Sequence, residues 1–134
     1  DGTPDVLVGS SWGGAVAAAL VAEGTWEGPL VLLCPALCMR ERWVGQPSGR
    51  AELSASAISS RIAALSPEVK ARAVIVHGDA DATVPIDDSR ELSRTTGIRM
   101  VDVVGGSHGL GEFVVAGHLA KVVREVCSSL EPAA

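Results

Sequence analysis

Three short segments of this 134-residue chain combine nucleophilic, basic and acidic side chains with glycine, and each follows an apolar run. They are VGSSWGG (8–14), HGDADATVP (77–85) and GGSHG (105–109). A serine hydroxyl is a weak nucleophile at neutral pH, so it needs a base within hydrogen-bond reach and a carboxylate to orient that base. The three segments together contain all of these groups, which is the chemistry of acyl transfer.

Within the first segment, Gly9-Ser10-Ser11-Trp12-Gly13 fits the pattern G-x-S-x-G with Ser11 at its centre. Ser11 is therefore the candidate nucleophile, and Ser10 is interpreted as a neighbour whose side chain points elsewhere. Asp81 and His108 could supply the acid and the base. They follow Ser11 in the chain order Ser, Asp, His that accompanies this pattern.

Four apolar segments are expected to be the strands that carry these groups at their carboxyl ends: 5–9, 29–36, 73–78 and 99–106. Continuous Val, Ile and Leu runs suit parallel strands that are covered on both faces. Helices are predicted over about 13–23, 51–65, 87–96 and 111–130. The alternation predicts an α/β fold with a doubly wound parallel sheet of about four strands and helices on both faces. Residues 1–134 are expected to form a single domain, with 38–66 as a candidate lid or pocket insert.

The three motifs, taken in order, resemble the C-terminal half of an α/β-hydrolase-superfamily enzyme. GSSWGG is similar to the nucleophile elbow of that family, HGDADATVP to its acid loop H-G-x-x-D-x-x-V-P, and GGSHG to its histidine loop. The resemblance implies that Ser11 is the nucleophile, Asp81 the acid and His108 the base, without a metal or organic cofactor. It also implies that earlier strands of the family's sheet are missing, which makes 5–9 an exposed edge. The chain is then either a fragment or a minimal variant that self-associates through this edge.

Other carboxylates compete with Asp81 for the acid role. Asp79 is the nearest competitor, and the family spacing favours Asp81. Asp87 and Asp88 are better interpreted as N-caps of the helix that follows them.

The other two histidines have simpler interpretations than His108. His77 closes a strand and is expected to be hydrogen-bonded scaffold, and His118 is expected on the surface of the last helix. Only His108 lies in a glycine-rich loop that could bring an imidazole to Ser11.

The resemblance makes the backbone N–H of Trp12 one oxyanion donor, while the second would come from a loop upstream of the first strand and is not identifiable. Trp12, Met39, Trp43 and Leu110 could line an apolar substrate pocket, although a place in the structural core is an equally good interpretation for each.

The composition limits the possible partners. A net charge of −5 and a sequence pI near 5.1 argue against a nucleic-acid surface and against an anionic membrane. The longest apolar stretch, AVAAALVA, is too short to span a bilayer, so a cytoplasmic protein with a small-molecule partner is expected. Three cysteines without C-x-x-C spacing, Cys34, Cys38 and Cys127, argue against a disulfide framework or a metal cluster.

The sequence thus predicts a serine hydrolase that cleaves an ester, thioester or similar acyl substrate through a Ser-His-Asp triad and an acyl-enzyme. The alternative is a non-catalytic α/β-hydrolase-like module, or an inactive fragment without the upstream oxyanion loop. Nucleotide binding is disfavoured because the chain contains no G-x-x-x-x-G-K-[ST] motif.

Overall fold

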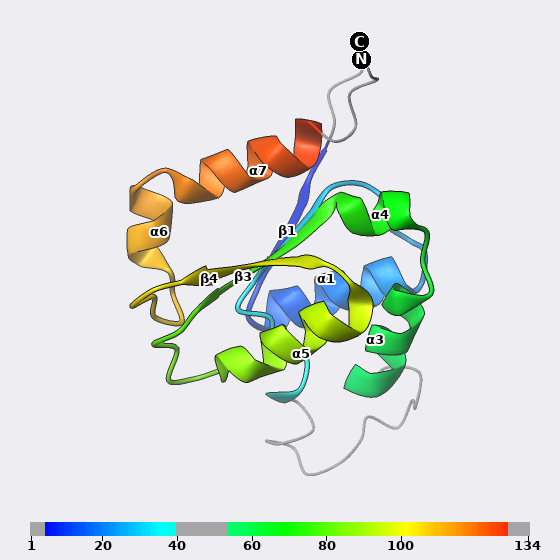
Figure 1. Cartoon of the computed structure of the whole chain (residues 1–134), viewed down its shortest axis with the longest axis horizontal. Coiled ribbons are helices and arrows are strands. Elements are labelled where there is room, and N and C mark those ends of the chain that lie inside the picture. The colour runs from blue at the N-terminus through cyan, green and yellow to red at the C-terminus, as the bar shows by residue number, and fades with distance from the viewer. Residues whose placement is uncertain (1–4, 40–53, 129–134) are drawn as a thin grey trace.

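A parallel four-stranded sheet forms the centre of the computed structural model, which describes residues 5–39 and 54–128 (Figure 1). The strands lie side by side in chain order: β1 (Leu7–Ser10), β2 (Leu30–Leu33), β3 (Ala73–Gly78) and β4 (Arg99–Val103). Because all neighbouring pairs are parallel, the four carboxyl ends lie along one edge of the sheet. The predicted α/β class with about four strands is confirmed.

Helices cover both faces of this sheet, as predicted. On one face α1 (Trp12–Ala22), α3 (Ala55–Ala63) and α5 (Ile86–Thr96) enclose a core with Leu30, Leu32 and Ile75. On the other face α7 (His118–Ser128) packs with Val31, Val74 and Val76, and Figure 1 shows it across the sheet from α1 and α5. Since both faces are covered, every residue of β2 and β3 is buried, which explains the continuous apolar runs.

Local signals account for most of the helix ends. Ser54 caps α3 by accepting a hydrogen bond from the Ala57 N–H at 3.1 Å. The short α4 (Pro67–Ala71) begins in the same way, with Ser66 as cap and Pro67 at the first helical position. The N-terminal part of the predicted 51–65 helix and about half of the candidate lid (38–66) lie in 40–53, outside the described residues.

The prediction that Asp87 or Asp88 caps the next helix is wrong. The N-cap of α5 is Pro85, whose backbone is extended (φ −60°, ψ 132°), and α5 begins at Ile86. Both aspartates therefore lie within the first helical turn, where their charge is favourable to the helix dipole.

The predicted single helix over 111–130 is also wrong, because two helices occupy this stretch. The first is α6 (Gly111–Val115), and α7 follows it after a break at Ala116 and Gly117. Gly117 adopts φ +78°, a left-handed conformation that glycine reaches without strain and that ends α6. The apolar stripe of α7 still packs on the sheet through Leu119, Val122 and Val126; Leu130 lies outside the described residues.

Among the described strands, β1 has one neighbour, β2, and so forms an edge of the sheet. Val8 on this strand is 42% exposed, which is high for a valine in a parallel sheet. Within residues 5–39 and 54–128, no helix combines the length and the hydropathy that a bilayer span requires.

Candidate active site

Ser11 lies in a sharp turn that joins the edge strand β1 directly to α1. Its backbone has φ 56° and ψ −117°, a combination that is costly for a residue with a side chain, by about 1–3 kcal/mol. Four backbone hydrogen bonds hold it in this conformation: the Ser11 N–H donates to the Leu33 carbonyl at 2.9 Å, and its carbonyl accepts from Gly14, Ala15 and Ala36 at 3.0, 3.3 and 2.9 Å. The turn therefore presents the Ser11 hydroxyl at the carboxyl edge of the sheet.

Gly9 makes this sharp turn possible because the start of α1 passes directly over it. A Cβ atom at Gly9 would lie 2.8 Å from the Gly13 carbonyl carbon and 2.9 Å from the Ala17 Cβ, both closer than side chains normally approach. The first glycine of the G-x-S-x-G pattern is thus required by the close approach of the strand and the helix.

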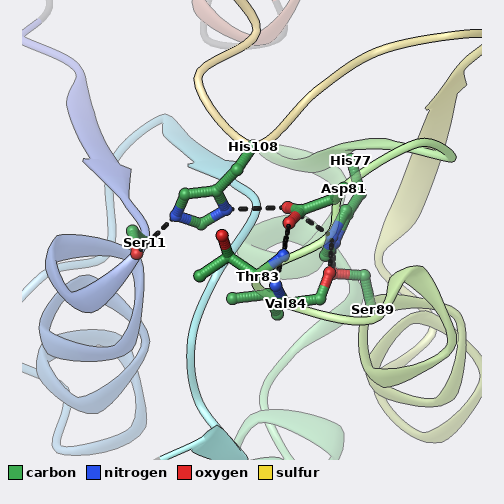
Figure 2. Close-up of polar contacts among 7 residues, drawn as sticks. All are labelled: Ser11, His77, Asp81, Thr83, Val84, Ser89 and His108. Carbon is green, nitrogen blue, oxygen red and sulfur yellow. Dashed lines mark hydrogen bonds and ion pairs between the residues drawn. The ribbon is translucent and has the colours of Figure 1, made fainter.

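Asp81 lies in the loop that follows β3, with its side chain fully buried. Its Oδ1 accepts hydrogen bonds from the backbone N–H groups of Thr83 and Val84, both at 2.8 Å, and its Oδ2 accepts from Nδ1 of His108 at 2.7 Å (Figure 2). Burial disfavours the charged form of this carboxyl. The hydrogen bonds from Val84, His108 and Thr83 outweigh burial and hold the pKa of Asp81 below its usual value.

The histidine loop is packed tightly against the acid loop. A Cβ at Gly78 would lie 2.8 Å from the Gly106 Cα, so the two backbones touch where β3 ends. Asp79, the alternative acid, accepts a hydrogen bond from the Gly105 N–H at 2.7 Å and the Ala80 N–H donates to the Gly106 carbonyl at 3.0 Å. In the structure Asp79 supports the loop that carries His108, and Asp81 is the residue that contacts the imidazole.

The three predicted residues form one continuous chain of hydrogen bonds. Nε2 of His108 lies 2.9 Å from Oγ of Ser11, and Nδ1 lies 2.7 Å from Oδ2 of Asp81 (Figure 2). An ionised carboxylate only accepts, so Nδ1 carries the proton and the unprotonated Nε2 accepts from the Ser11 hydroxyl. This tautomer leaves the imidazole ready to take the proton of a nucleophilic serine.

His77 is hydrogen-bonded at the end of β3, as the sequence predicted, and it also lies next to Asp81. It is fully buried, and its Nε2 lies 2.9 Å from the Val84 carbonyl and 3.1 Å from Oδ2 of Asp81. Its Nδ1 lies 2.6 Å from the hydroxyl of Ser89 in α5. The signal in the sequence is the position of His77 on β3, four residues before Asp81, which marks it as a neighbour of the acid loop.

Cys34 is a second neighbour that sequence reasoning missed. It follows β2 directly, is fully buried, and adopts φ 43° although it is not glycine. Burial raises the pKa of its thiol to about 11; a hydrogen bond from the Gly78 backbone opposes this rise, and the Asp81 carboxylate adds to it. The thiol is therefore uncharged at neutral pH.

Cys34, His77 and Asp81 also have the side-chain types of a metal site, and one ligand atom from each lies within 4.8 Å of the others. The carboxylate and imidazole atoms in this cluster already form hydrogen bonds with protein groups. The arrangement is accounted for by the network around Asp81 without an ion. The three cysteines, all within the described residues, are in no disulfide.

The four residues suggested for substrate contact lie in different environments. Trp12 is 43% exposed at the first position of α1, next to Ser11. Met39 is buried with Ala36 and Val84, and Leu110 is buried in the core under α7, so the core alternative describes the surroundings of both. Trp43 lies outside the described residues.

A groove of about 310 Å³ lies between α3 and α5, away from the three residues around Ser11. Its wall includes Pro35, Leu37 and Cys38, which belong to the segment after β2, together with serines of α3 and acidic residues of α5. No member of the Ser11, His108 and Asp81 chain lines it.

Solved structures of similar fold cover nearly the whole chain. Est1E from Butyrivibrio proteoclasticus matches with a TM-score of 0.63 and 19% identity over 96% of this chain and 62% of that one. An alpha-beta serine hydrolase homologue from Coxiella burnetii matches with a TM-score of 0.52 and 20% identity over 96% of this chain and 50% of that one. The Paleococcus ferrophilus monoacylglycerol lipase matches with a TM-score of 0.56 and 16% identity over 93% of this chain and 69% of that one. No protein-family model matches the chain, and no curated protein sequence does.

These comparisons show that the chain has the α/β-hydrolase fold, which confirms the fold that the resemblance implies. They also show a difference in extent, because the chain spans 62% of Est1E and 50% of the Coxiella burnetii structure.

Proposed function

We propose that this chain carries the catalytic triad of a serine hydrolase that cleaves an ester, thioester or similar acyl substrate. The observation that carries the proposal is the unbroken hydrogen-bond chain from Ser11 Oγ through the His108 imidazole to Asp81, with distances of 2.9 and 2.7 Å. The strained backbone of Ser11 supports it, since such strain is concentrated at functional sites. The substrate is a small acyl compound, and neither a metal nor an organic cofactor takes part.

The reaction proceeds in two acyl-transfer steps. Ser11 Oγ attacks the acyl carbonyl while His108 Nε2 accepts the hydroxyl proton, and Asp81 stabilises the imidazolium. The tetrahedral intermediate then collapses, the bond to the leaving group breaks, and the imidazolium returns the proton to that group. A water molecule, deprotonated by His108, then attacks the acyl-enzyme; the bond between the acyl carbon and Ser11 Oγ breaks, the carboxylic acid leaves, and the imidazolium returns the proton to Ser11 Oγ.

Negative charge that develops on the carbonyl oxygen needs a donor close to the nucleophile. Trp12 is the first residue of α1, so its backbone N–H belongs to a helix N-terminus, where N–H groups and the helix dipole favour an anion. We assign this N–H as one oxyanion donor. A second donor on a loop that precedes β1 would lie upstream of the described residues, and no residue is assigned to it.

The names of the similar structures favour carboxylic esters among the possible substrates. One of them is a monoacylglycerol lipase, and Est1E has also been solved with ferulic acid bound. Ester cleavage by this chain is accordingly the first activity to assay, with short acyl esters of a chromogenic alcohol as substrates.

The decisive experiment is intact-mass analysis after exposure to a fluorophosphonate, which forms a covalent adduct with an activated serine. We expect one adduct on the parent protein and none on Ser11→Ala. Ser10→Ala is the matched control, because it removes the adjacent hydroxyl and should leave labelling unchanged. His108→Ala should slow labelling by at least about 10³-fold, whereas His118→Ala, on the exposed start of α7, should not.

A parent protein that is folded by circular dichroism and takes up no label would overturn the proposal. That result would favour the alternative, a non-catalytic module or an inactive fragment, in which the three residues are present without a complete site. Equal labelling of the Ser10→Ala and Ser11→Ala variants would overturn the assignment of the nucleophile.

A further inference from the structure

We infer that His77 is a positioning residue for the triad, acting on His108 through the carboxylate of Asp81. This inference rests on the proposed hydrolase function. The carboxylate lies between two imidazoles: His108 Nδ1 is 2.7 Å from Oδ2, and His77 Nε2 is 3.1 Å from the same oxygen. Figure 2 shows the two rings on opposite sides of Asp81.

The hydrogen-bond partners of His77 fix its tautomer. Nε2 faces two acceptors, the Val84 carbonyl at 2.9 Å and Oδ2 of Asp81, so this nitrogen must carry the proton in the neutral ring. The Ser89 hydroxyl, 2.6 Å from Nδ1, then donates to the unprotonated nitrogen. Ser89 is 1% exposed on α5, so the contact is shielded from solvent and the ring is held with its N–H toward the acid.

The donors around Asp81 explain why this contact affects the reaction. Oδ1 accepts hydrogen bonds from the N–H groups of Thr83 and Val84, and Oδ2 accepts one from Nδ1 of His108. Nε2 of His77, which is hydrogen-bonded to the Val84 carbonyl, lies 3.1 Å from Oδ2, so its N–H dipole contacts the buried carboxylate beside the His108 bond. His77 therefore holds Oδ2 in line with the His108 ring.

His77 also joins the acid loop to the rest of the fold, since it connects β3 to the Val84 backbone and to Ser89 in α5. A purely structural role would be exerted through these two bonds alone and would be independent of the Asp81 carboxylate. The two roles differ in whether the effect of changing His77 depends on the presence of that carboxylate.

The test is a double-mutant cycle in the fluorophosphonate labelling rate, with His77→Leu and Asp81→Asn separately and together, and His77→Gln as the conservative variant. We expect His77→Leu to lower the maximal labelling rate about tenfold, because the Asp81 carboxylate loses a polar neighbour, with the concentration for half-maximal rate unchanged. His77→Gln keeps an N–H near Oδ2 and should stay within about threefold of the parent. In the Asp81→Asn background, His77→Leu should have no further effect. The same loss in both backgrounds would overturn the inference.

A second measurement separates this inference from the proposed function and does not depend on His77→Leu folding. Nitrogen-15 NMR of the parent chain reports the protonation of each imidazole nitrogen, and we expect His77 with a protonated Nε2 and an unprotonated Nδ1. The Nδ1 proton resonance of His108 should move in the His77→Gln variant, because the two rings share Oδ2. A parent that takes no label but shows this tautomer and this shift would refute the hydrolase and retain the positioning contact. A parent with His77 protonated at Nδ1 alone would refute the positioning contact whatever the labelling result.

Discussion

The two glycines of the G-x-S-x-G pattern should respond in opposite ways to the same substitution. A Cβ at Gly9 would lie 2.8 Å from the Gly13 carbonyl carbon, whereas a Cβ at Gly13 would have no heavy atom within 4 Å. Gly9→Ala therefore forces the strand and the helix apart, and Gly13→Ala adds a methyl group in open space. The G-x-S-x-G pattern does not distinguish the two glycines, so a difference between the two alanine variants would test the close approach of β1 and α1 at Gly9.

The size of the effect follows from these distances. Ordinary contact begins at 3.4 Å, so relief of the 2.8 Å contact requires a shift of at least about 0.6 Å in the turn that carries Ser11. Overpacking of this kind costs roughly 1–3 kcal/mol in stability. A displacement approaching 1 Å at a reacting atom lowers the rate by up to about 100-fold. For Gly13→Ala the higher helix propensity of alanine should add about 0.5–1 kcal/mol to stability, with labelling within about twofold of the parent.

The assay is the fluorophosphonate labelling rate of both variants beside the parent, together with their thermal unfolding midpoints. Gly9→Ala should lose labelling rate and melt lower, and Gly13→Ala should keep the rate and melt a few degrees higher, about 2–5 °C. Equal losses in the two variants, or a Gly9→Ala protein that labels at the parent rate, would refute the idea that close packing of β1 on α1 positions Ser11.

Three further outcomes follow from the acid, the buried thiol and the open edge. The lowered pKa of Asp81 means that its ionised form stabilises the fold above about pH 4, the usual value for an unfolded aspartate, and that this contribution disappears as pH falls through the folded pKa. Urea unfolding from pH 7 to pH 2 should accordingly show a shallower acid loss for Asp81→Asn than for the parent, and parallel curves would contradict it. Iodoacetamide at pH 8 should alkylate the half-buried Cys38 and Cys127 in the native protein and leave Cys34 unmodified until urea is added. Cys34 is protected by its burial and by the pKa of about 11 of its thiol. Peptide mapping that finds Cys34 modified in the native protein would contradict this. Sedimentation should show concentration-dependent self-association of the parent and less of it in Val8→Lys, because an edge lysine opposes strand pairing, and identical profiles would argue against pairing through β1.

The sequence predicted the sheet well because burial on both faces leaves an unambiguous pattern. Every residue of β3 is buried, and the predicted 73–78 strand agrees with the observed bounds at both ends. The ends of the other elements depend on local geometry that composition does not carry. Gly117 could have been an ordinary helix residue, and it is its left-handed conformation that divides the last helix in two.

In the candidate site too, the sequence could predict some residues, while other contacts depend on local geometry. The sequence could predict that Ser11, Asp81 and His108 lie together, because each lies in a short glycine-containing motif whose order along the chain is informative. The second histidine at Asp81 was missed as a contact, because the distance from His77 Nε2 to Oδ2 depends on how the 77–84 loop folds back on its own strand. Asp79 and Asp81 are two residues apart, and the structure separates them through the partner of each: the Gly105 backbone for Asp79 and the His108 ring for Asp81.

The position of β1 at the edge of the sheet has a consequence for how long the site stays assembled. The N–H groups of Leu7 and Ser11 donate to carbonyls on the β2 side. Because successive N–H groups along a strand point to opposite sides, those of Val8 and Ser10 point toward the open edge. Ser11 thus follows an edge strand with one row of ladder bonds, and His108 follows β4, the other edge of the described sheet, while Asp81 follows β3, which is paired on both sides. Edge strands open locally at a lower free energy than a whole domain unfolds. Fraying of β1 or of β4 would separate Ser11 from His108 while the rest of the domain stayed folded, so the lifetime of their hydrogen bond depends on the two edge strands more than on the global stability of the protein.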